Sequence, residues 1–232
     1  LASYLQTGPG RFYRQGINSP TELSEGFPDT AEDLYQYDAV VMGDIGREFF
    51  TDEQLALLQD FVAERGGGLL VAGMLDDAFV DTVLGDILPL TPVRSEVLPS
   101  FLQGGIRRGA HATGELFVPR LTSAGEFSPL LRLDSDDTVN RRLWGEMPAL
   151  QGVYVTGRPK PGASVLLEHP SLQYQNQAVP LLATQRYGSG RSMALTTAST
   201  WRWQMLMPSD DESHQRIWRQ SLRWLAQDAL ER

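Results

Sequence analysis

The segment from Arg65 to Met74 has the residue pattern of a turn that presents a nucleophile, but no nucleophile stands at its end. Gly66 to Gly68 stop a predicted helix, a short apolar strand follows, and the chain leaves that strand sharply at Gly73. The thioether of Met74 cannot be deprotonated to an attacking thiolate. Because the 232-residue chain contains no cysteine, thiol catalysis, thiolate metal sites and disulfides are excluded together.

No other residue pattern predicts a nucleophile paired with a base. The histidines at positions 111, 169 and 214 have no obvious nucleophile beside them, and no Gly-x-Ser-x-Gly turn occurs. His111 and His169 are predicted in polar loops, and His214 in the first turn of the last helix. We interpret each of them as a surface histidine, so no catalytic residue is assigned.

Carboxylates and glycines are the remaining candidates for binding a metal or a phosphate. Residues 134–137 begin like a calcium loop but lack the later glycine and glutamate of that pattern, which favours a solvated acidic turn. Asp76 and Asp77 could ligate a metal, although capping of the following helix is the simpler interpretation. The glycines at 66–68 and 188–190 lack the flanking residues of phosphate-binding loops. No metal or cofactor site is therefore predicted.

Two tryptophans flank an arginine at Trp201, Arg202 and Trp203, directly after a predicted strand. Aromatic rings beside a cation could form a recognition surface. Large aromatic side chains more often serve the core, which favours packing against the last helix, where Trp218 and Trp224 lie. The sequence leaves both interpretations open.

The charge balance narrows the classes of partner. The chain has 20 basic and 29 acidic residues, a net charge of −9 and a pI near 4.8. Phosphate backbones and anionic lipids both attract clustered Lys and Arg, so we expect no nucleic-acid partner. No apolar run approaches the ~20 residues of a membrane span, so we expect no direct membrane insertion by this segment.

The elements that would position these residues alternate between strand and helix in the first third of the chain. Thr51 and Gln54 match a capping box, and Leu58 and Phe61 then share one helical face. The apolar runs on either side of this helix are typical of buried parallel strands, which predicts a right-handed βαβ unit. The predicted elements are strands at 1–6, 38–43 and 68–73, and helices at 30–36 and 51–65.

Residues 75–160 are less regular, with one predicted helix at 76–88. Regularity returns with strands at 163–168, 178–187 and 192–197, of which the last two read as a hairpin. An amphipathic helix from about Asp211 closes the chain. We expect residues 1–232 to form a single α/β domain with an irregular insertion in its middle.

Several of these segments together resemble a known group of proteins. The matching segments are Phe12–Gly16, Gly26–Pro28, Tyr37–Asp44, Phe50–Gln54, Arg65–Leu70, Lys160–Ala163, Gln185–Arg191 and Ser199–Trp203. In combination they are similar to the class I glutamine amidotransferase-like domain of large bacterial membrane proteins, which often carry, or are encoded beside, von Willebrand factor A domains. Trehalose-utilisation-type proteins are more distantly similar. The resemblance covers nearly the whole chain, and its motifs are specific only together.

The resemblance implies a flavodoxin-like layered sheet that is mostly parallel. Active amidotransferases carry a cysteine where Met74 stands, and a histidine followed by a glutamate near the position of Ser199. Both catalytic residue types are missing, so no catalytic role is carried over and no glutaminase activity is expected. Such a fold usually begins with a strand and a helix that would precede Leu1, which implies that this chain is a fragment of a longer protein.

The resulting functional hypothesis is a non-catalytic domain that serves as a binding or interaction module of a larger membrane-anchored bacterial protein. Its partner would be a protein or other domains of the same polypeptide, with the anchor outside this segment and the domain on the extracytoplasmic side. The alternatives are a small-ligand-binding or enzymatic domain that uses the former active-site crevice, and a structural spacer. The crevice lies beyond the carboxyl ends of the strands in such sheets. Its expected residues are Asp44, Met74, Asp76, Ser199 and Trp201.

Overall fold

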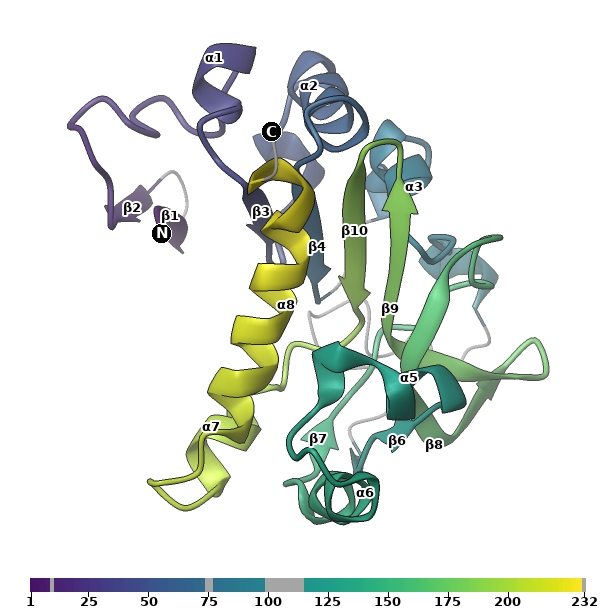
Figure 1. Ribbon diagram of the computed structural model, residues 1–232. Coiled ribbons are helices and arrows are strands. Elements are labelled where there is room, and N and C mark those ends of the chain that lie inside the picture. The colour runs from purple at the N-terminus through teal and green to yellow at the C-terminus, as the bar shows by residue number, and fades with distance from the viewer. Residues whose placement is uncertain (9–10, 74–76, 99–114, 231–232) are drawn as a thin grey trace.

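The computed structural model of the chain describes residues 1–8, 11–73, 77–98 and 115–230, and its centre is a six-stranded sheet (Figure 1). The strands follow the order β3-β4-β10-β9-β8-β6. Their bounds are β3 Ala39–Met42, β4 Gly68–Ala72, β6 Arg120–Leu121, β8 Ser164–Tyr174, β9 Gln177–Tyr187 and β10 Gly190–Leu195.

The first half of this sheet contains the predicted βαβ unit. β3 pairs in parallel with β4, and helix α2 (Asp52–Ala63) connects them. The capping box is present, because the Thr51 hydroxyl accepts from the Gln54 N–H at 3.1 Å and the Gln54 side chain accepts from the Thr51 N–H at 2.9 Å. The parallel pairing and the packed helix between the strands are therefore confirmed.

The prediction of a mostly parallel, flavodoxin-like sheet is wrong. β10 runs parallel to β4, but β10–β9, β9–β8 and β8–β6 are all antiparallel, so antiparallel pairs outnumber parallel ones. The cause lies in the connections: Gln175 and Asn176, with φ of 52° and 61°, form a two-residue turn between β8 and β9, and Gly188 and Ser189 join β9 to β10. Two residues can only reverse a strand, whereas a parallel crossover needs a dozen or more.

The remaining elements surround the sheet. The strand expected at 1–6 pairs with the following segment as a separate hairpin, to one side of the sheet in Figure 1. The elements are β1 Ser3–Gly8, β2 Arg11–Gln15, β5 Leu116–Phe117, β7 Leu150–Gln151, α1 Ala31–Leu34, α3 Val83–Ile87, α5 Ser123–Phe127, α6 Asp137–Glu146, α7 Trp201–Leu206, α8 Ser213–Leu230, and the 3₁₀ turns Arg47–Phe49, Asp77–Phe79, Ser95–Val97 and Pro129–Leu131. None of the helices in the described ranges is both long and apolar enough to span a membrane.

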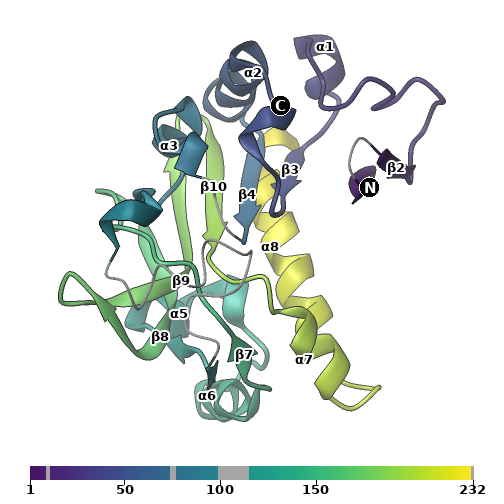
Figure 2. The same ribbon diagram turned by 180° about the vertical axis from the view of Figure 1, so that it is seen from behind.

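Two apolar clusters fill the two faces of the sheet. Alternation along β4 sends Leu69 and Val71 to the cluster with α2 and α3, and Leu70 to the cluster with α8. Figures 1 and 2 show α8 across one face, with α2 and α3 nearer the viewer when the molecule is seen from behind. Leu58 and Phe61, on the predicted apolar face of α2, are fully buried.

Helix α8 is attached to β10 through Arg191, the residue that ends the glycine-rich turn. Its guanidinium forms a two-pronged ion pair with Asp228, with Nε–Oδ2 at 2.7 Å and Nη2–Oδ1 at 3.0 Å. It also donates to the Trp224 carbonyl and to Gln227 Oε1. On the neighbouring strand β4, Gly68 allows helix α8 to approach closely, because a Cβ at this position would collide with the backbone of Leu225.

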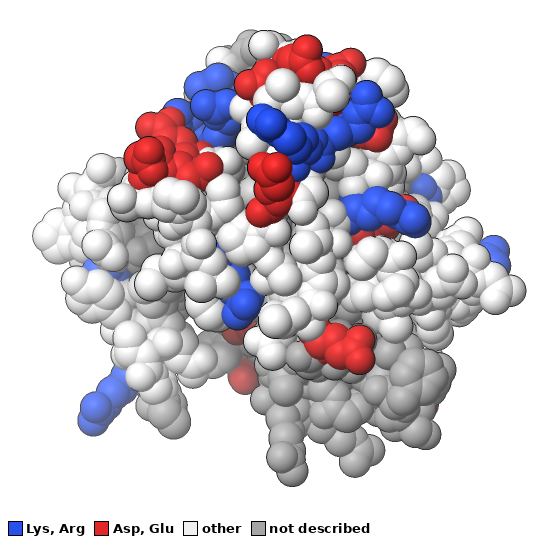
Figure 3. Space-filling view, turned by 90° about the horizontal axis from the view of Figure 1, so that it is seen from below, with Lys and Arg blue, Asp and Glu red and all other residues white. Residues whose placement is uncertain are grey.

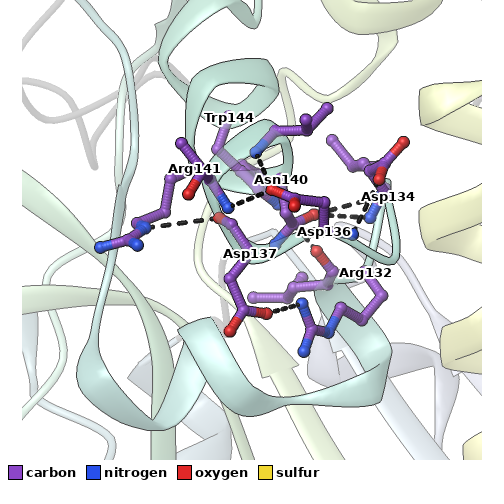
Figure 4. A network of polar contacts seen from close by, with 11 residues as sticks. Arg132, Asp134, Asp136, Asp137, Asn140, Arg141 and Trp144 are labelled. Atoms are coloured by element: carbon purple, nitrogen blue, oxygen red, sulfur yellow. Dashed lines mark hydrogen bonds and ion pairs between the residues drawn. The ribbon is translucent and has the colours of Figure 1, made fainter.

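The acidic turn before α6 is a helix cap (Figure 4). The Asp136 carboxylate accepts from the N–H groups of Thr138 and Val139 at 2.8 and 2.9 Å, and these donors lower the pKa of Asp136. Asn140 Oδ1 accepts from the Leu133 N–H at 2.8 Å. The acidic residues thus start helix α6. This helix was not predicted from the sequence, which indicated an irregular region here.

Candidate functional site

The carboxyl ends of β4 and β10 meet at one edge of the sheet, as the crevice hypothesis requires. The Gly73 N–H donates to the Leu195 carbonyl at 2.8 Å, which places the two strand ends side by side. A cavity of about 50 Å³ lies at this edge. Its polar wall is formed by Asp77, Tyr154, Thr156 and Thr196, and its apolar wall by Val71, Leu88, Leu90, Pro92, Val93, Val155, Ala194 and Leu195.

Asp44 and Tyr154 form the polar contact at this edge. The Tyr154 hydroxyl donates to Asp44 Oδ2 at 3.4 Å, and the Tyr154 N–H donates to the Thr196 carbonyl at 2.7 Å. Burial, followed by the charge and hydrogen bond of Asp44, raises the pKa of Tyr154 to about 12. Gly73, with φ of 105°, makes room for this arrangement, since a Cβ there would collide with the Asp44 carboxylate.

The hydroxyl of Thr156 is the unsatisfied polar group of the cavity. Its Oγ1 is buried and has no hydrogen-bond partner within the described part of the chain. By contrast, the Thr196 hydroxyl donates to the Pro180 carbonyl at 2.6 Å. A buried hydroxyl without a partner costs free energy.

The predicted crevice residues take different places. Asp44 is exposed at the cavity edge, whereas Ser199 is buried, with its Oγ accepting from the Gln151 N–H at 3.0 Å and lying 2.9 Å from Thr197 Oγ1. Trp201 lies on α7, with 54% of its surface exposed. Met74 and Asp76 lie outside the described residues. The structure therefore places Asp44 against Tyr154 at the sheet edge, gives Ser199 a structural hydrogen bond and turns Trp201 outward.

Sequence reasoning missed Tyr154 and Thr156. Both lie in the stretch read as irregular, where the apolar run Val153–Val155 was the available signal. That run enters the wall of the cavity because the Tyr154 N–H bonds to the end of β10 rather than to a neighbouring hairpin strand.

The interpretation of His169 as a surface residue is wrong. The side chain is 4% exposed and its ring lies 4.1 Å from that of Phe117. Nδ1 accepts from the Ser171 and Leu172 N–H groups at 3.2 and 2.8 Å, which fixes the irregular bend in β8. Burial lowers the pKa of His169, and a ring held in this way is a structural part of the strand.

His214 lies in the first turn of α8, as predicted, with Nδ1 3.1 Å from Gln204 Oε1. His111 falls outside the described residues. Across the described ranges, no three His, Asp or Glu side chains gather closely enough to hold a metal ion.

Helix α7 presents an exposed apolar face. Trp201, Met205 and Leu206 are 54%, 70% and 56% exposed, and we call these three residues the α7 face. Trp203 points inward, is 2% exposed and donates from Nε1 to the Pro148 carbonyl at 3.0 Å. Trp203 is therefore the structural plug, whereas Trp201 is on the surface, where a recognition role stays a prediction.

The end of the molecule that carries α6 and α7 faces the viewer in Figure 3. Acidic and basic side chains lie beside one another across the upper part of this view, and broad uncharged areas surround them.

Comparisons with known proteins support the fold alone. No protein-family model matches the sequence, and no curated protein matches it. The cytoplasmic protein STM3548 from Salmonella typhimurium has a similar structure, with a TM-score of 0.59, 17% identity and coverage of 97% of this chain and 94% of that one. The cytoplasmic protein STM1381 from Salmonella typhimurium LT2 gives a TM-score of 0.59, 18% identity and coverage of 97% and 96%. Neither likeness lends support to a flavodoxin-like sheet.

Proposed function

We propose that this chain is a non-catalytic amidotransferase-like domain that serves as an interaction module of a larger membrane-anchored bacterial protein. The observation that carries the proposal is the α7 face, whose three large apolar side chains are each more than half exposed. Apolar side chains gathered at one place on a surface are typical of protein–protein contact sites. The motif resemblance supports the setting in a larger membrane-anchored protein.

The second candidate function is small-ligand binding or catalysis at the carboxyl edge of the sheet. The Asp44–Tyr154 contact and the unsatisfied Thr156 hydroxyl favour it. The cavity of about 50 Å³ is small, however, beside the roughly 300–1,000 Å³ of typical ligand pockets. Its size supports the interaction module over the ligand-binding domain.

The interaction proposal can be tested by photocrosslinking in the native host. A photoreactive amino acid at position 205 should give crosslinks to another protein or domain, because that side chain is 70% exposed on the α7 face. The control places the same amino acid at position 127, where Phe127 is 72% exposed on α5. Equal crosslinking at both positions would contradict a specific contact through α7.

The non-catalytic part is tested by ammonia release from glutamine. We expect no rate above a protein-free control, because a thioether at Met74 supplies no nucleophile. A measurable rate that disappears in Asp44→Asn would instead favour an enzyme that uses the carboxyl edge of the sheet.

A further inference from the structure

The α7 face lies next to a short acidic segment in the chain. Asp210, Asp211 and Glu212 connect α7 to α8, and Asp210 and Glu212 are exposed. Asp211 accepts from the Ser213 N–H at 2.8 Å at the start of α8. No ion pair found between described residues uses any of these three carboxylates. An apolar surface is therefore followed in the chain by carboxylates outside these ion pairs, while the Arg202 guanidinium lies over the Trp201 ring, 5.7 Å from its centroid.

Inward contacts hold the helix so that this face points outward. Trp203 packs edge-on against Trp144 with ring centres 5.7 Å apart, and Arg202 Nε donates to the Ala149 carbonyl at 2.7 Å. Trp201 and Met205 are one helical turn apart and so share a side of the helix. The apolar side chains are thus presented on a fixed element, which lowers the entropic cost of binding.

The charge of the chain near the α7 face distinguishes between the kinds of molecule that could bind there. Anionic lipids and nucleic acids carry negative charge and would be repelled by the acidic segment and by the net charge of −9. A second copy docked through the same face would bring two acidic segments to one interface, where like charges are unfavourable. A positively charged partner gains both the apolar contact and the electrostatic attraction.

We propose that the α7 face binds a basic amphipathic segment of a partner protein, in which apolar side chains contact Met205 and Leu206 and Lys or Arg side chains pair with Asp210 and Glu212. This inference rests on the proposed function and adds the chemistry of the partner to it. Buried apolar contacts carry most of the affinity in such interfaces, while the charge pairs at the rim set association rate and specificity.

The test is selection of random dodecapeptides on the purified domain, followed by measurement of each retained peptide against a Met205→Ser/Leu206→Ser variant. We expect the retained peptides to combine apolar residues with a net positive charge. Their affinity should fall about tenfold or more in the double serine variant, and severalfold in Asp210→Asn/Glu212→Gln, with the second loss shrinking at high salt. Glu25→Gln/Asp29→Asn and Phe127→Ser are the matched controls and should bind within about twofold of the parent.

The outcomes separate the two proposals. Retained peptides that are neutral or acidic would overturn the basic partner and leave the α7 face as a contact surface. If the double serine variant retains the same peptides as the parent, the contact surface itself fails, and the proposed function with it. Sedimentation velocity tests whether a second copy of the chain occupies the α7 face. A dimer that is lost in the double serine variant would assign the face to that second copy.

Discussion

At the scale of single residues, the Asp44–Tyr154 contact shows how burial and a neighbouring carboxylate change the pKa of a side chain at the sheet edge. A phenol that is 4% exposed beside a carboxylate keeps its proton, because both burial and the neighbouring charge oppose a phenolate. A protonated Tyr154 can donate a hydrogen bond but cannot act as a base at neutral pH. The Tyr154 hydroxyl is therefore a hydrogen-bond donor at this edge.

Asp44→Asn should lower the pKa of Tyr154, because the substitution removes the negative charge that helps to raise it. Ultraviolet titration of tyrosinate measures the change, and Tyr154→Phe identifies the signal by removing it. The raised pKa adds stability that is complete below the ordinary value of 10.0 and is lost as pH rises through about 12. In Asp44→Asn this loss should be smaller and should end at a lower pH, because the pKa of Tyr154 in the folded state is lower. An unchanged Tyr154 titration would mean that Asp44 does not act on the phenol.

At the scale of elements, the attachment of α8 depends on the Arg191–Asp228 ion pair. Both side chains are largely buried, at 8% and 13% exposure, and removal of Arg191 would leave the buried Asp228 carboxylate beside the exposed Arg186, at 3.3 Å. We expect Arg191→Met to destabilise the fold by about 3 kcal/mol. Arg120→Met, which breaks the more exposed pair with Glu168, should cost under about 1 kcal/mol.

Urea unfolding measures both variants. If the cost of Arg191→Met comes from the buried Asp228 carboxylate, which would still lie 3.3 Å from the more exposed Arg186, Arg191→Met/Asp228→Leu should recover part of the stability. Equal midpoints for Arg191→Met and Arg120→Met would show that the buried ion pair does not hold the helix to the sheet.

The sequence predicted an element correctly where every residue of a local motif was present. Thr51 and Gln54 satisfy both halves of a capping box, and the glycine turn at 188–190 permits a hairpin. The turn at Gln175 and Asn176 was missed because the left-handed backbone is much less expected of glutamine than of glycine. That turn extends β8 and β9 to eleven residues each and makes the antiparallel half of the sheet.

The site was less predictable than the fold. Asp44 follows a strand and contacts Tyr154 at the sheet edge, whereas Ser199 bonds to Gln151, 48 residues away in the chain. Such a contact depends on how the irregular stretch folds back across the end of β10. Local patterns carry no information about that path, so Tyr154 and Thr156 were not found.

At the scale of the whole molecule, the two apolar clusters share β4 and should unfold together. Leu58→Ala and Phe61→Ala leave cavities on the α2 side and should each cost roughly 2–5 kcal/mol. The buried Trp144 and Trp203 belong to the α8 side, so a single cooperative unit predicts that tryptophan fluorescence will report the full loss. Leu206→Ala, at an exposed position, is the control. A tryptophan transition unmoved by Leu58→Ala would show that the two sides unfold separately.

The exposure of Met205 also has a consequence for oxidation chemistry. Met42, Met147 and Met193 are at most 5% exposed, whereas Met205 is 70% exposed, so a mild peroxide should reach Met205 long before it reaches these three. The sulfoxide is polar and would remove apolar character from the α7 face while the core remains intact. Peptide mass mapping after brief peroxide treatment would detect this order. The same side chain that suits the face to a partner thus makes the contact sensitive to oxidants and, through methionine sulfoxide reductases, recoverable.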